Sequence, residues 1–371
     1  MSTFVISCGG TGGHLSPGIA LAEEMIKRGN QCYLIISNKE VDSRLIGKYS
    51  QIEFVRIPGV GFSCKFTGII KFIREQIKGI LFAIKFLHKI KPDIVIGFGG
   101  FTTVGLSLAA RMLGFPIFLH EANRKVGKAI RFLSVLANRV YLPCGVHLKS
   151  LPPKTLRNFG FPVRKEIRPI AKSLACKKLE IKANVKRLLI LGGSQGAGVL
   201  NKWVFENFEH LAELGIHVYC VTGLGKGSVG KLEYTAKNGV SAEAIFVPFV
   251  DDMTSVLSCA DLVLSRAGAG SIAEICRCHI PAILIPYPFA ADNHQEANAI
   301  FFESQGGGLV INETNMDQLY SEVMALIFND WLLDKFQQNM KLMDIQSNLA
   351  LIANDLEEFC IQEETLSLQS S

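Results

Sequence analysis

Two glycine-rich segments have the clearest capacity for chemistry, because each comes directly after an apolar, strand-like run. Gly9-Gly-Thr-Gly-Gly-His14 follows Phe4–Cys8, and Gly192-Gly-Ser-Gln-Gly-Ala197 follows Leu188–Leu191. A strand that turns into a helix through glycines leaves unpaired N–H groups and the positive end of the helix directed at one point, where no Cβ keeps a phosphate away. The sequence therefore predicts two loops that bind an anionic group.

His14 is the only titratable side chain in the first of these loops. Its imidazole could accept a proton from an attacking hydroxyl near neutral pH. It could equally serve only as a hydrogen-bond partner of a phosphate or of a neighbouring loop. Both roles stay open at the level of the sequence.

Named nucleotide motifs fit the chain poorly. The one literal G-x-G-x-x-G is Gly225–Gly230, and it fails to extend into a P-loop because Leu232 stands where a Ser or Thr would hold magnesium. A phosphate-binding loop that opens a helix is one interpretation of this segment. A surface loop is the other, and we favour it.

A serine hydrolase is an alternative from another class of enzyme. Gly192–Gly196 also reads as G-x-S-x-G between a strand and a helix, and Asp261 and either His279 or His294 follow in the order of an α/β-hydrolase triad. A hydrolase has one central sheet, however, whereas the first 160 residues here form a complete glycine-loop unit of their own. We therefore rank the hydrolase below a nucleotide-dependent enzyme.

The sequence contains no recognisable metal site. His120-Glu121 does not continue into H-E-x-x-H, and no Asp-x-Asp pair is present to hold a divalent ion against a diphosphate. We expect no metal and no cofactor. Helix dipoles and backbone amides would then have to compensate the negative charge of a bound nucleotide diphosphate.

Two series of short apolar runs, alternating with helical segments, must position these loops. The first series is Phe4–Cys8, Cys32–Ile36, Phe54–Ile57, Ile94–Phe98, Ile117–His120 and Val140–Leu142; the second is Leu188–Leu191, His217–Val221, Ala244–Val247, Leu262–Leu264, Ala282–Ile285 and Leu309–Ile311. Such alternation predicts an α/β fold with two doubly wound, Rossmann-like parallel sheets. Ligands bind beyond the carboxyl ends of such strands, so we expect the two domains to face one central cleft.

The rest of the chain follows from this division. Phe161–Val185, with two prolines and many lysines, is predicted to cross between the domains. After the last strand we expect helix from about Met316 to Phe359, followed by a frayed polar tail over Ile361–Ser371.

Composition excludes disorder and a membrane span. Of the 371 residues 49% are hydrophobic and 19% charged, and the longest uncharged apolar stretch, Ile94–Ala110, is too short to span a bilayer and contains four glycines. The start of the chain does not resemble a signal peptide, and the ten cysteines have no repeated spacing, so we expect a cytoplasmic protein with reduced thiols. The net charge of +6 is too small to demand nucleic acid but suits an anionic ligand or lipid surface.

One predicted helix, over residues 67–91, is amphipathic and basic. Its apolar residues recur every three or four positions, while the basic residues follow the opposite side. The apolar set is Ile69, Ile73, Ile77, Ile80, Ile84 and Leu87, flanked by Phe62, Phe66, Phe72, Phe82 and Phe86; the basic set is Lys71, Arg74, Lys78, Lys85 and Lys89. A core helix with a solvated basic face is one interpretation, and a helix that docks on anionic lipid is the other.

Eight ordered motifs span nearly the whole chain. They are Gly9-Gly-Thr-Gly-Gly-His14, Gly97-Phe-Gly-Gly100, His120-Glu-Ala-Asn123, Gly160-Phe-Pro-Val-Arg164, Gly192-Gly-Ser-Gln-Gly-Ala197, Phe249-Val-Asp-Asp-Met253, Ser265-Arg-Ala-Gly-Ala-Gly-Ser-Ile-Ala-Glu274 and Asp292-Asn-His-Gln295. In order and spacing the sequence resembles the MurG family, the peptidoglycan N-acetylglucosaminyltransferases of the GT-B superfamily.

The resemblance implies an inverting, metal-independent transfer of GlcNAc from UDP-GlcNAc to the 4-hydroxyl of the muramoyl sugar in lipid I, which yields lipid II and UDP. It also implies a peripheral position on the cytoplasmic face of the plasma membrane. The alternatives within the fold are another UDP-sugar transferase with a different lipid or small-molecule acceptor, and a nucleotide-sugar binding protein without catalytic activity.

The resemblance further implies roles for individual residues. Glu274 would accept both ribose hydroxyls, and Ala269, Gly270, Ser271, Ile272 and Ala273 would form with it a helix N-terminus facing the diphosphate. Val250 would pair with the uracil edge through its backbone, with Arg266 packed nearby, and Ser194 would bind phosphate. Gln295 and His294 would read the sugar hydroxyls.

In the first domain, Thr11, Gly12 and Gly13 would close over the donor, and Asn123 and Arg164 would lie where the domains meet. We therefore expect residues 1–163 to form an acceptor and membrane domain, with a helix at about 343–360 packed back on it, and residues 164–342 to bind UDP-GlcNAc. Two residues depart from the family pattern: Ala122 and Phe161 replace the usual Gln and Asn.

Overall fold

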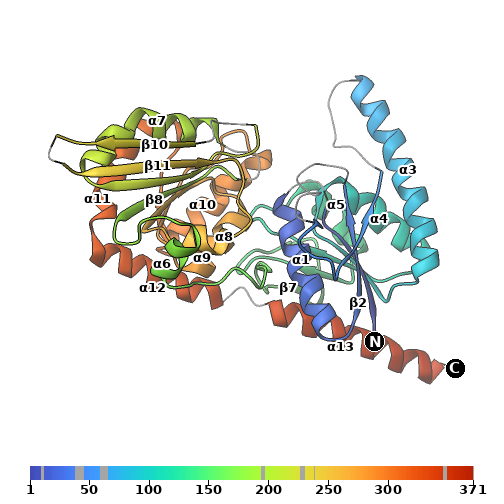
Figure 1. Cartoon of the computed structure of the whole chain (residues 1–371). Coiled ribbons are helices and arrows are strands. Elements are labelled where there is room, and N and C mark those ends of the chain that lie inside the picture. The colour runs from blue at the N-terminus through green and yellow to red at the C-terminus, as the bar shows by residue number, and fades with distance from the viewer. Residues whose placement is uncertain are drawn as a thin grey trace. The chain divides into compact units, whose positions relative to one another are not determined.

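The computed structural model describes residues 1–9, 12–37, 46–58, 66–193, 197–225, 230–237, 239–345 and 349–370. The chain divides into two compact units, one formed by Met1–Arg164 with Gln346–Ser371 and the other by Lys165–Ile345. Within these residues each unit contains one seven-stranded sheet (Figure 1).

The elements of the first unit alternate between strand and helix, as the apolar runs predict. They are β1 (Thr3–Ser7), α1 (Gly12–Lys27), β2 (Gln31–Ile36), β3 (Glu53–Arg56), α3 (Phe66–Ile90), β4 (Ile94–Gly97), α4 (Gly100–Leu113), β5 (Ile117–His120), α5 (Lys128–Leu133), the 3-10 turn η1 (Ser134–Leu136), β6 (Arg139–Tyr141), η2 (Pro153–Thr155), β7 (Leu156–Arg157) and α13 (Leu349–Ser370).

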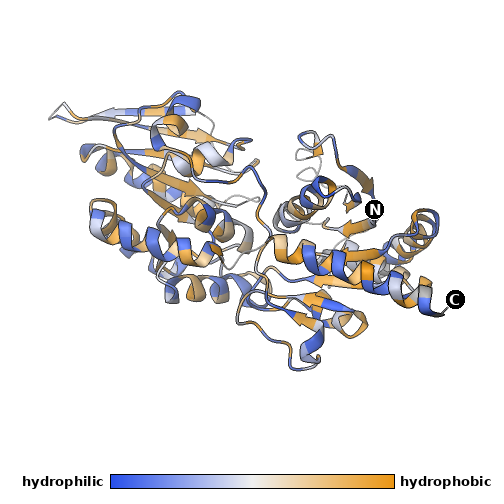
Figure 2. Ribbon diagram, turned by 90° about the horizontal axis from the view of Figure 1, so that it is seen from below, coloured by the Kyte–Doolittle hydropathy of each residue, from blue (hydrophilic) through white to orange (hydrophobic). Residues whose placement is uncertain are grey.

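The first sheet is parallel throughout, in the order β3-β2-β1-β4-β5-β6-β7. Its strands are apolar on both faces because helices cover both. In β1, Phe4 and Ile6 belong to a core cluster with α1 and α13, whereas Val5 belongs to the cluster beneath α3, α4 and α5. Figure 2 shows the same pattern, with mostly apolar strands and helices that carry apolar and polar faces.

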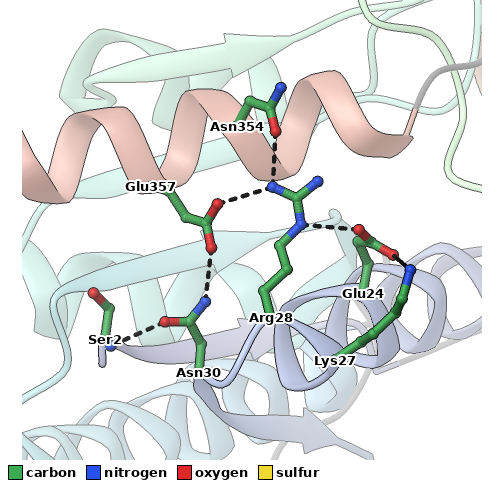
Figure 3. A network of polar contacts seen from close by, with 7 residues as sticks. All are labelled: Ser2, Glu24, Lys27, Arg28, Asn30, Asn354 and Glu357. Atoms are coloured by element: carbon green, nitrogen blue, oxygen red, sulfur yellow. Dashed lines mark hydrogen bonds and ion pairs between the residues drawn. The ribbon is translucent and has the colours of Figure 1, made fainter.

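Helix α13 returns the end of the chain to the first unit, where polar contacts attach it to α1 (Figure 3). Arg28 donates to Glu24 at 2.8 Å, to Asn354 at 2.7 Å and to Glu357 at 2.8 Å, and Asn30 donates to Glu357 at 3.0 Å. The predicted frayed tail is wrong, since α13 is helical as far as Ser370.

The second unit repeats the alternation. Its elements are α6 (Lys172–Lys178), β8 (Lys186–Leu191), α7 (Gly198–Glu213), β9 (Ile216–Val221), β10 (Gly230–Thr235), β11 (Ser241–Val247), α8 (Met253–Ser258), β12 (Leu262–Ser265), α9 (Ala269–Cys278), β13 (Ala282–Leu284), η3 (Ala291–Asn293), α10 (His294–Ser304), β14 (Gly308–Val310), η4 (Glu313–Gln318), α11 (Leu319–Ile327) and α12 (Asp330–Ile345).

Two details of the second unit correct the sequence analysis. The sheet, ordered β10-β11-β9-β8-β12-β13-β14, is parallel except for β10, which pairs antiparallel with β11. A strand therefore begins at Gly230, so the phosphate-binding loop that opens a helix is excluded at Gly225–Gly230; Lys226–Val229 lie outside the described residues. In addition, the predicted crossing contains α6, which packs on α8 within the second unit.

Helix α3 packs against α4, and its buried side differs from the predicted one. Gly79, Ala83 and Leu87 are buried, whereas Ile77 and Leu81 are more than half exposed. Phe82 and Phe86 stack at 6.2 Å and pack against the core. The exposed face therefore combines two aliphatic side chains with Arg74, Lys78 and Lys85; the side chains of residues 59–73, which include Ile69, Lys71 and Phe72, lie outside the description.

Nine of the ten cysteines lie in the described residues, and all nine are free thiols. Cys144 is partly exposed and the other eight are buried, while Cys64 lies outside the description. None of the helices that the structure describes combines the length and hydropathy needed to span a bilayer.

Candidate active site

His14 lies in the first turn of α1, and not in the glycine-rich loop as the sequence predicted. Its imidazole is half-buried against the turn between β4 and α4: a Cβ added to Gly99 would lie 3.3 Å from His14 Nε2, and one on Gly100 would lie 3.4 Å from Nδ1. Both glycines have positive φ, 96° and 77°, which other residues rarely adopt. Two turns of the sheet therefore meet at the imidazole.

The turn after β1 passes very close to the end of β2. A Cβ on Gly9 would lie 2.5 Å from the backbone nitrogen of Ser37, so only glycine fits there. Thr11 lies outside the described residues; Gly12 begins α1, and Gly13 is exposed beside His14. Of the predicted glycine loop, the described part thus brings Gly9, Gly12 and Gly13 to the carboxyl end of β1.

His120, at the end of β5, is a buried neutral imidazole. Its Nε2 lies 3.0 Å from the carbonyl oxygen of Gly160, and because a carbonyl can only accept, Nε2 carries the proton and Nδ1 is left as an acceptor. Burial lowers the pKa of His120 to about 4. The ring also packs at 4.9 Å on Phe98, next to the glycines that support His14.

Glu121 organises the loop that follows β5. Its carboxylate accepts from the backbone N–H of Asn123 at 2.8 Å, from the Asn123 side chain at 3.1 Å and from the backbone N–H of Gly127 at 2.7 Å. Burial raises the pKa of this carboxyl, and these hydrogen bonds lower it in part. Glu121 is therefore structural, and the predicted site residue Asn123 is oriented by it.

Phe161 and Arg164 lie at the end of the first unit. Phe161, one of the two departures from the family pattern, packs edge-on against His120 with ring centroids 6.3 Å apart. Arg164 is buried and donates to the hydroxyl of Tyr49 at 3.3 Å. Phe161 thus adds apolar packing on His120.

The second glycine-rich segment of the sequence, Gly192–Ala197, lies between β8 and α7 of the second unit. Ser194 lies outside the described residues, together with Gln195 and Gly196. Gly193 has a φ of 74°, and α7 begins at Gly198. The chain therefore passes from strand to helix here, as the sequence predicts.

The start of α9, which follows β12, carries six of the predicted donor-site residues. Helix α9 begins at Ala269, as predicted, with extended backbone at Gly268 and no side-chain cap. Because the first N–H groups of a helix lack partners within it, this uncapped end can bind an anion. Ala269, Gly270, Ser271, Ile272 and Ala273 form the first turns, and Glu274 follows half-buried.

Arg266 and Asn298 stabilise the turn between β12 and α9 through hydrogen bonds to backbone carbonyls. Arg266 is buried, lies 2.6 Å from Glu313 and donates to the carbonyl oxygens of Ile285 and Pro286 at 3.2 and 3.3 Å. Asn298 donates to the carbonyl oxygen of Ala267 at 3.1 Å. Sequence reasoning missed Asn298 and Glu313. The available signal for Asn298 was its position four residues after His294, one turn along the helix that begins there.

Gln295 and His294 open α10 and are both oriented by backbone. Gln295 accepts from the N–H of Tyr287 at 3.0 Å, so its NH₂ group stays available to a ligand. His294 Nδ1 lies 2.7 Å from the carbonyl oxygen of Ala291, which makes Nδ1 the donor and leaves Nε2 as an acceptor in the neutral ring. The guanidinium carbon of Arg266 lies 5.4 Å from the ring centroid of Tyr287, so Tyr287 contacts both Gln295 and Arg266.

Val250 lies in the segment between β11 and α8. It is half-buried, and Asp252 two residues later caps α8 by accepting from the N–H of Ser255 at 3.0 Å. This segment follows β11 at the carboxyl end of the sheet. Val250 and the start of α9 are therefore at the same end of the second unit.

The hydrolase alternative is contradicted by the sheet. Asp261 immediately precedes β12 and accepts from Lys172 at 2.6 Å and from the N–H of Arg187 at 2.7 Å, which places it at the amino ends of the strands. His279 caps the end of α9 and leads into β13 at that same end. The loop of Ser194 follows the carboxyl end of β8, so neither residue can assist it.

A cavity of about 350 Å³ also lies at the amino ends of this sheet, lined by Lys172, Lys186, Asp261 and Asp330 among others. Cys278 and Ile280 also line it, so it lies at the end of α9 opposite to Ala269. In the part of the chain that the structure describes, no cluster of three His, Cys, Asp or Glu side chains is arranged to hold a metal ion.

Comparison with known proteins assigns the family. Residues 4–142 match the glycosyltransferase family 28 N-terminal domain, and residues 187–356 match the glycosyltransferase family 28 C-terminal domain. A protein of Opitutus terrae is 52% identical over 96% of this chain and 95% of its own length, and it is named UDP-N-acetylglucosamine--N-acetylmuramyl-(pentapeptide) pyrophosphoryl-undecaprenol N-acetylglucosamine transferase. A protein of the same name from Nitratidesulfovibrio vulgaris is 34% identical over 88% of both chains. The chain belongs to this family, the MurG glycosyltransferases.

Solved structures agree with the assignment. The crystal structure of Acinetobacter baumannii MurG is similar with a TM-score of 0.65 and 25% identity, over 92% of this chain and 94% of that one. The calicheamicin glycosyltransferase CalG4 reaches a TM-score of 0.66 at 14% identity over 98% of this chain and 99% of its own, a likeness that concerns the fold alone. The predicted family and GT-B fold are confirmed.

Proposed function

We propose that this glycosyltransferase transfers GlcNAc from UDP-GlcNAc to the 4-hydroxyl of the muramoyl sugar of lipid I, and so forms lipid II and UDP for peptidoglycan synthesis, on which cell shape and division depend. The observation that carries the proposal is 52% identity along 96% of the chain with a relative that bears this name. The intact start of α9 supports it, because its sequence matches the family motif through Glu274.

The second unit binds the donor in this proposal. Uncapped amides at Ala269, Gly270 and Ser271 receive the diphosphate, which needs no metal because the helix end supplies positive charge. Glu274 accepts hydrogen bonds from the ribose hydroxyls, and the backbone of Val250 forms hydrogen bonds with the edge of uracil. Ser194 contributes to the phosphate site. Gln295 donates its NH₂ to sugar hydroxyls, and His294 Nε2 accepts from them.

The first unit binds the acceptor, and His14 acts as its general base. The imidazole is partly exposed at the carboxyl end of β1, beside the exposed Gly13. A base there takes the proton of the 4-hydroxyl as the oxygen attacks the anomeric carbon, and UDP leaves from the opposite side with inversion. In this assignment Thr11, Gly12 and Gly13 close over the donor, next to the diphosphate of the acceptor.

We assign the exposed face of α3 to an anionic membrane surface on the cytoplasmic side. Ile77 and Leu81 are 53% and 56% exposed, and Arg74, Lys78 and Lys85 lie exposed around them. Aliphatic side chains surrounded by basic ones suit the boundary between lipid headgroups and acyl chains. Glu75, 2.9 Å from Lys78, offsets part of this positive charge.

One assay tests the function. Purified enzyme is incubated with UDP-GlcNAc and a lipid I analogue, and UDP release and the disaccharide product are followed. Release that requires both substrates supports the proposal. Transfer to a different acceptor, or binding of UDP-GlcNAc with no turnover, would favour another UDP-sugar transferase or a binding protein.

A further inference from the structure

Three buried hydroxyl groups lie beneath the two turns that meet at His14. They belong to Ser7 at the end of β1 and to Thr102 and Thr103 in the first turn of α4, and none is more than 2% exposed. Ser7 Oγ lies 3.1 Å from Thr102 Oγ1, which lies 3.2 Å from the carbonyl oxygen of Gly9. Thr103 Oγ1 lies 2.7 Å from the carbonyl oxygen of Gly99.

The direction of these hydrogen bonds follows from the proton count. Each hydroxyl has one proton, and a carbonyl oxygen can only accept. Thr102 therefore donates to Gly9, Ser7 donates to Thr102, and Thr103 donates to Gly99. Two consecutive residues of α4 thus hold one carbonyl from each glycine turn.

The two bonds differ in what they constrain. The bond from Thr103 to Gly99 spans four residues, and such bonds back to the preceding turn are common for threonine in helices. The bond from Thr102 to Gly9 spans 93 residues and joins the turn after β1 to the turn after β4. Thr102 is therefore the group that fixes one glycine turn relative to the other.

The position of His14 depends on that relation. A Cβ on Gly100 would lie 2.8 Å from the carbonyl oxygen of Gly9, so the two turns touch, and the imidazole of His14 rests on Gly99 and Gly100. Glycine has no side chain with which to fix such a turn. His14 belongs to α1, which follows the turn at Gly9, whereas its imidazole rests on the turn that contains Gly99 and Gly100. A change in the distance between these two turns therefore moves the imidazole relative to the glycines on which it rests.

We propose that Thr102 is a positioning residue for His14, with Ser7 and Thr103 completing a hydroxyl network that holds the two glycine turns in register. This inference rests on the proposed role of His14 as general base. It predicts that the network affects the proton-transfer step and leaves donor binding in the second unit unchanged.

The test compares Thr102→Val, which keeps the shape and removes the donor, with Thr102→Ser, which keeps the hydroxyl. We expect Thr102→Val to lower kcat by about 10- to 100-fold, the effect of displacing a catalytic group by a fraction of an ångström to one ångström, with the KM for UDP-GlcNAc within about twofold. Thr102→Ser should restore most of kcat. Ser107→Ala is the matched control, since Ser107 is equally buried in α4 and its hydroxyl has no hydrogen-bond partner among the described residues.

A double mutant separates positioning from a general loss of structure. In a His14→Ala background, Thr102→Val should change kcat by less than about twofold, because the group that it positions is already absent. Multiplicative losses, or a Thr102→Val kcat equal to that of Ser107→Ala, would overturn the inference. If Thr102→Val does not fold, Thr102→Cys, whose S–H is a weak donor, is judged by the same criteria. A normal kcat in His14→Ala alone would instead refute the base assignment.

Discussion

Replacement of Glu274 by alanine tests the donor site most directly. The residue lies in α9, five positions after Ala269, and its side chain is half-buried. Hydrogen bonds to a charged acceptor contribute about 1.5 to 3 kcal/mol each, so two bonds to ribose would contribute roughly 3 to 6 kcal/mol. Partial exposure to solvent reduces this by about a third. We expect Glu274→Ala to weaken binding of UDP by about 2 to 4 kcal/mol.

That free energy corresponds to roughly a 30- to 700-fold increase in the dissociation constant. Titration calorimetry with UDP alone measures it without the acceptor or the membrane. Glu274→Gln, which keeps one carbonyl oxygen as acceptor but loses the charge, should lie between wild type and Glu274→Ala. Glu296→Ala, an exposed carboxylate at the start of α10 in the same unit, is the matched control and should bind UDP normally.

Two results would refute the reasoning about Glu274. One is a folded Glu274→Ala variant that binds UDP as wild type does, since the carboxylate would then lie outside the ribose site. The other is an equal loss in Glu296→Ala, which would indicate a general electrostatic effect. Thermal unfolding of each variant shows that the comparison is made between folded proteins.

Four further predictions follow from the site and the fold. His14→Gln should lower kcat by about 10²- to 10⁴-fold with the KM for UDP-GlcNAc nearly unchanged, as steady-state kinetics will show; a kcat within a few-fold of wild type would assign the proton to another group. Turnover should persist in EDTA, and a loss that magnesium or manganese restores would contradict the metal-free site. Charge reversal of Arg74, Lys78 and Lys85 should abolish sedimentation with phosphatidylglycerol vesicles, because each basic residue near such a surface contributes about 1 kcal/mol of binding free energy. Turnover of a water-soluble acceptor should stay intact. Equal vesicle binding by wild type and variant would show that this face of α3 contacts only solvent. The pKa of His120 is lowered in the folded state to about 4, so the unfolded chain binds more protons than the folded one between pH 6.5 and 4. The free energy of unfolding should therefore fall by about 3 kcal/mol as the pH decreases through that range. Urea unfolding of His120→Asn should lack this part of the acid dependence, and an unchanged dependence would place its origin in another group.

The sequence determined the fold class and the family because both depend on local patterns. The predicted runs match the observed strands to within one or two residues for most of the sheet, including Ile117–His120, because strands covered on both faces must be continuously apolar. The start of α9 at Ala269 agrees with what the resemblance to the MurG family implied for Ala269–Glu274.

Elements without such a pattern were missed. Strand β10 is exposed at nearly every position and carries charged residues on the edge of the sheet, so no apolar run marks it. The last turns of α13 are polar and exposed and resemble a frayed tail, although the helix that begins in the core continues through them. On α3, the buried side was misassigned because Gly79 and Ala83 form the contact with the rest of the unit, and small residues contribute little to an apolar stripe.

Only the tertiary structure decided which side chains support the site. Arg266 meets Glu313, which is 47 positions later in the chain, and Thr102 meets Gly9, which is 93 positions earlier, because the order of parallel strands brings distant turns to the same edge of a sheet. Nothing in the spacing of these residues indicates their pairing. The sequence therefore determined which residues could do chemistry, whereas strand order and register decided which buried hydroxyls, amides and ion pairs hold them in place.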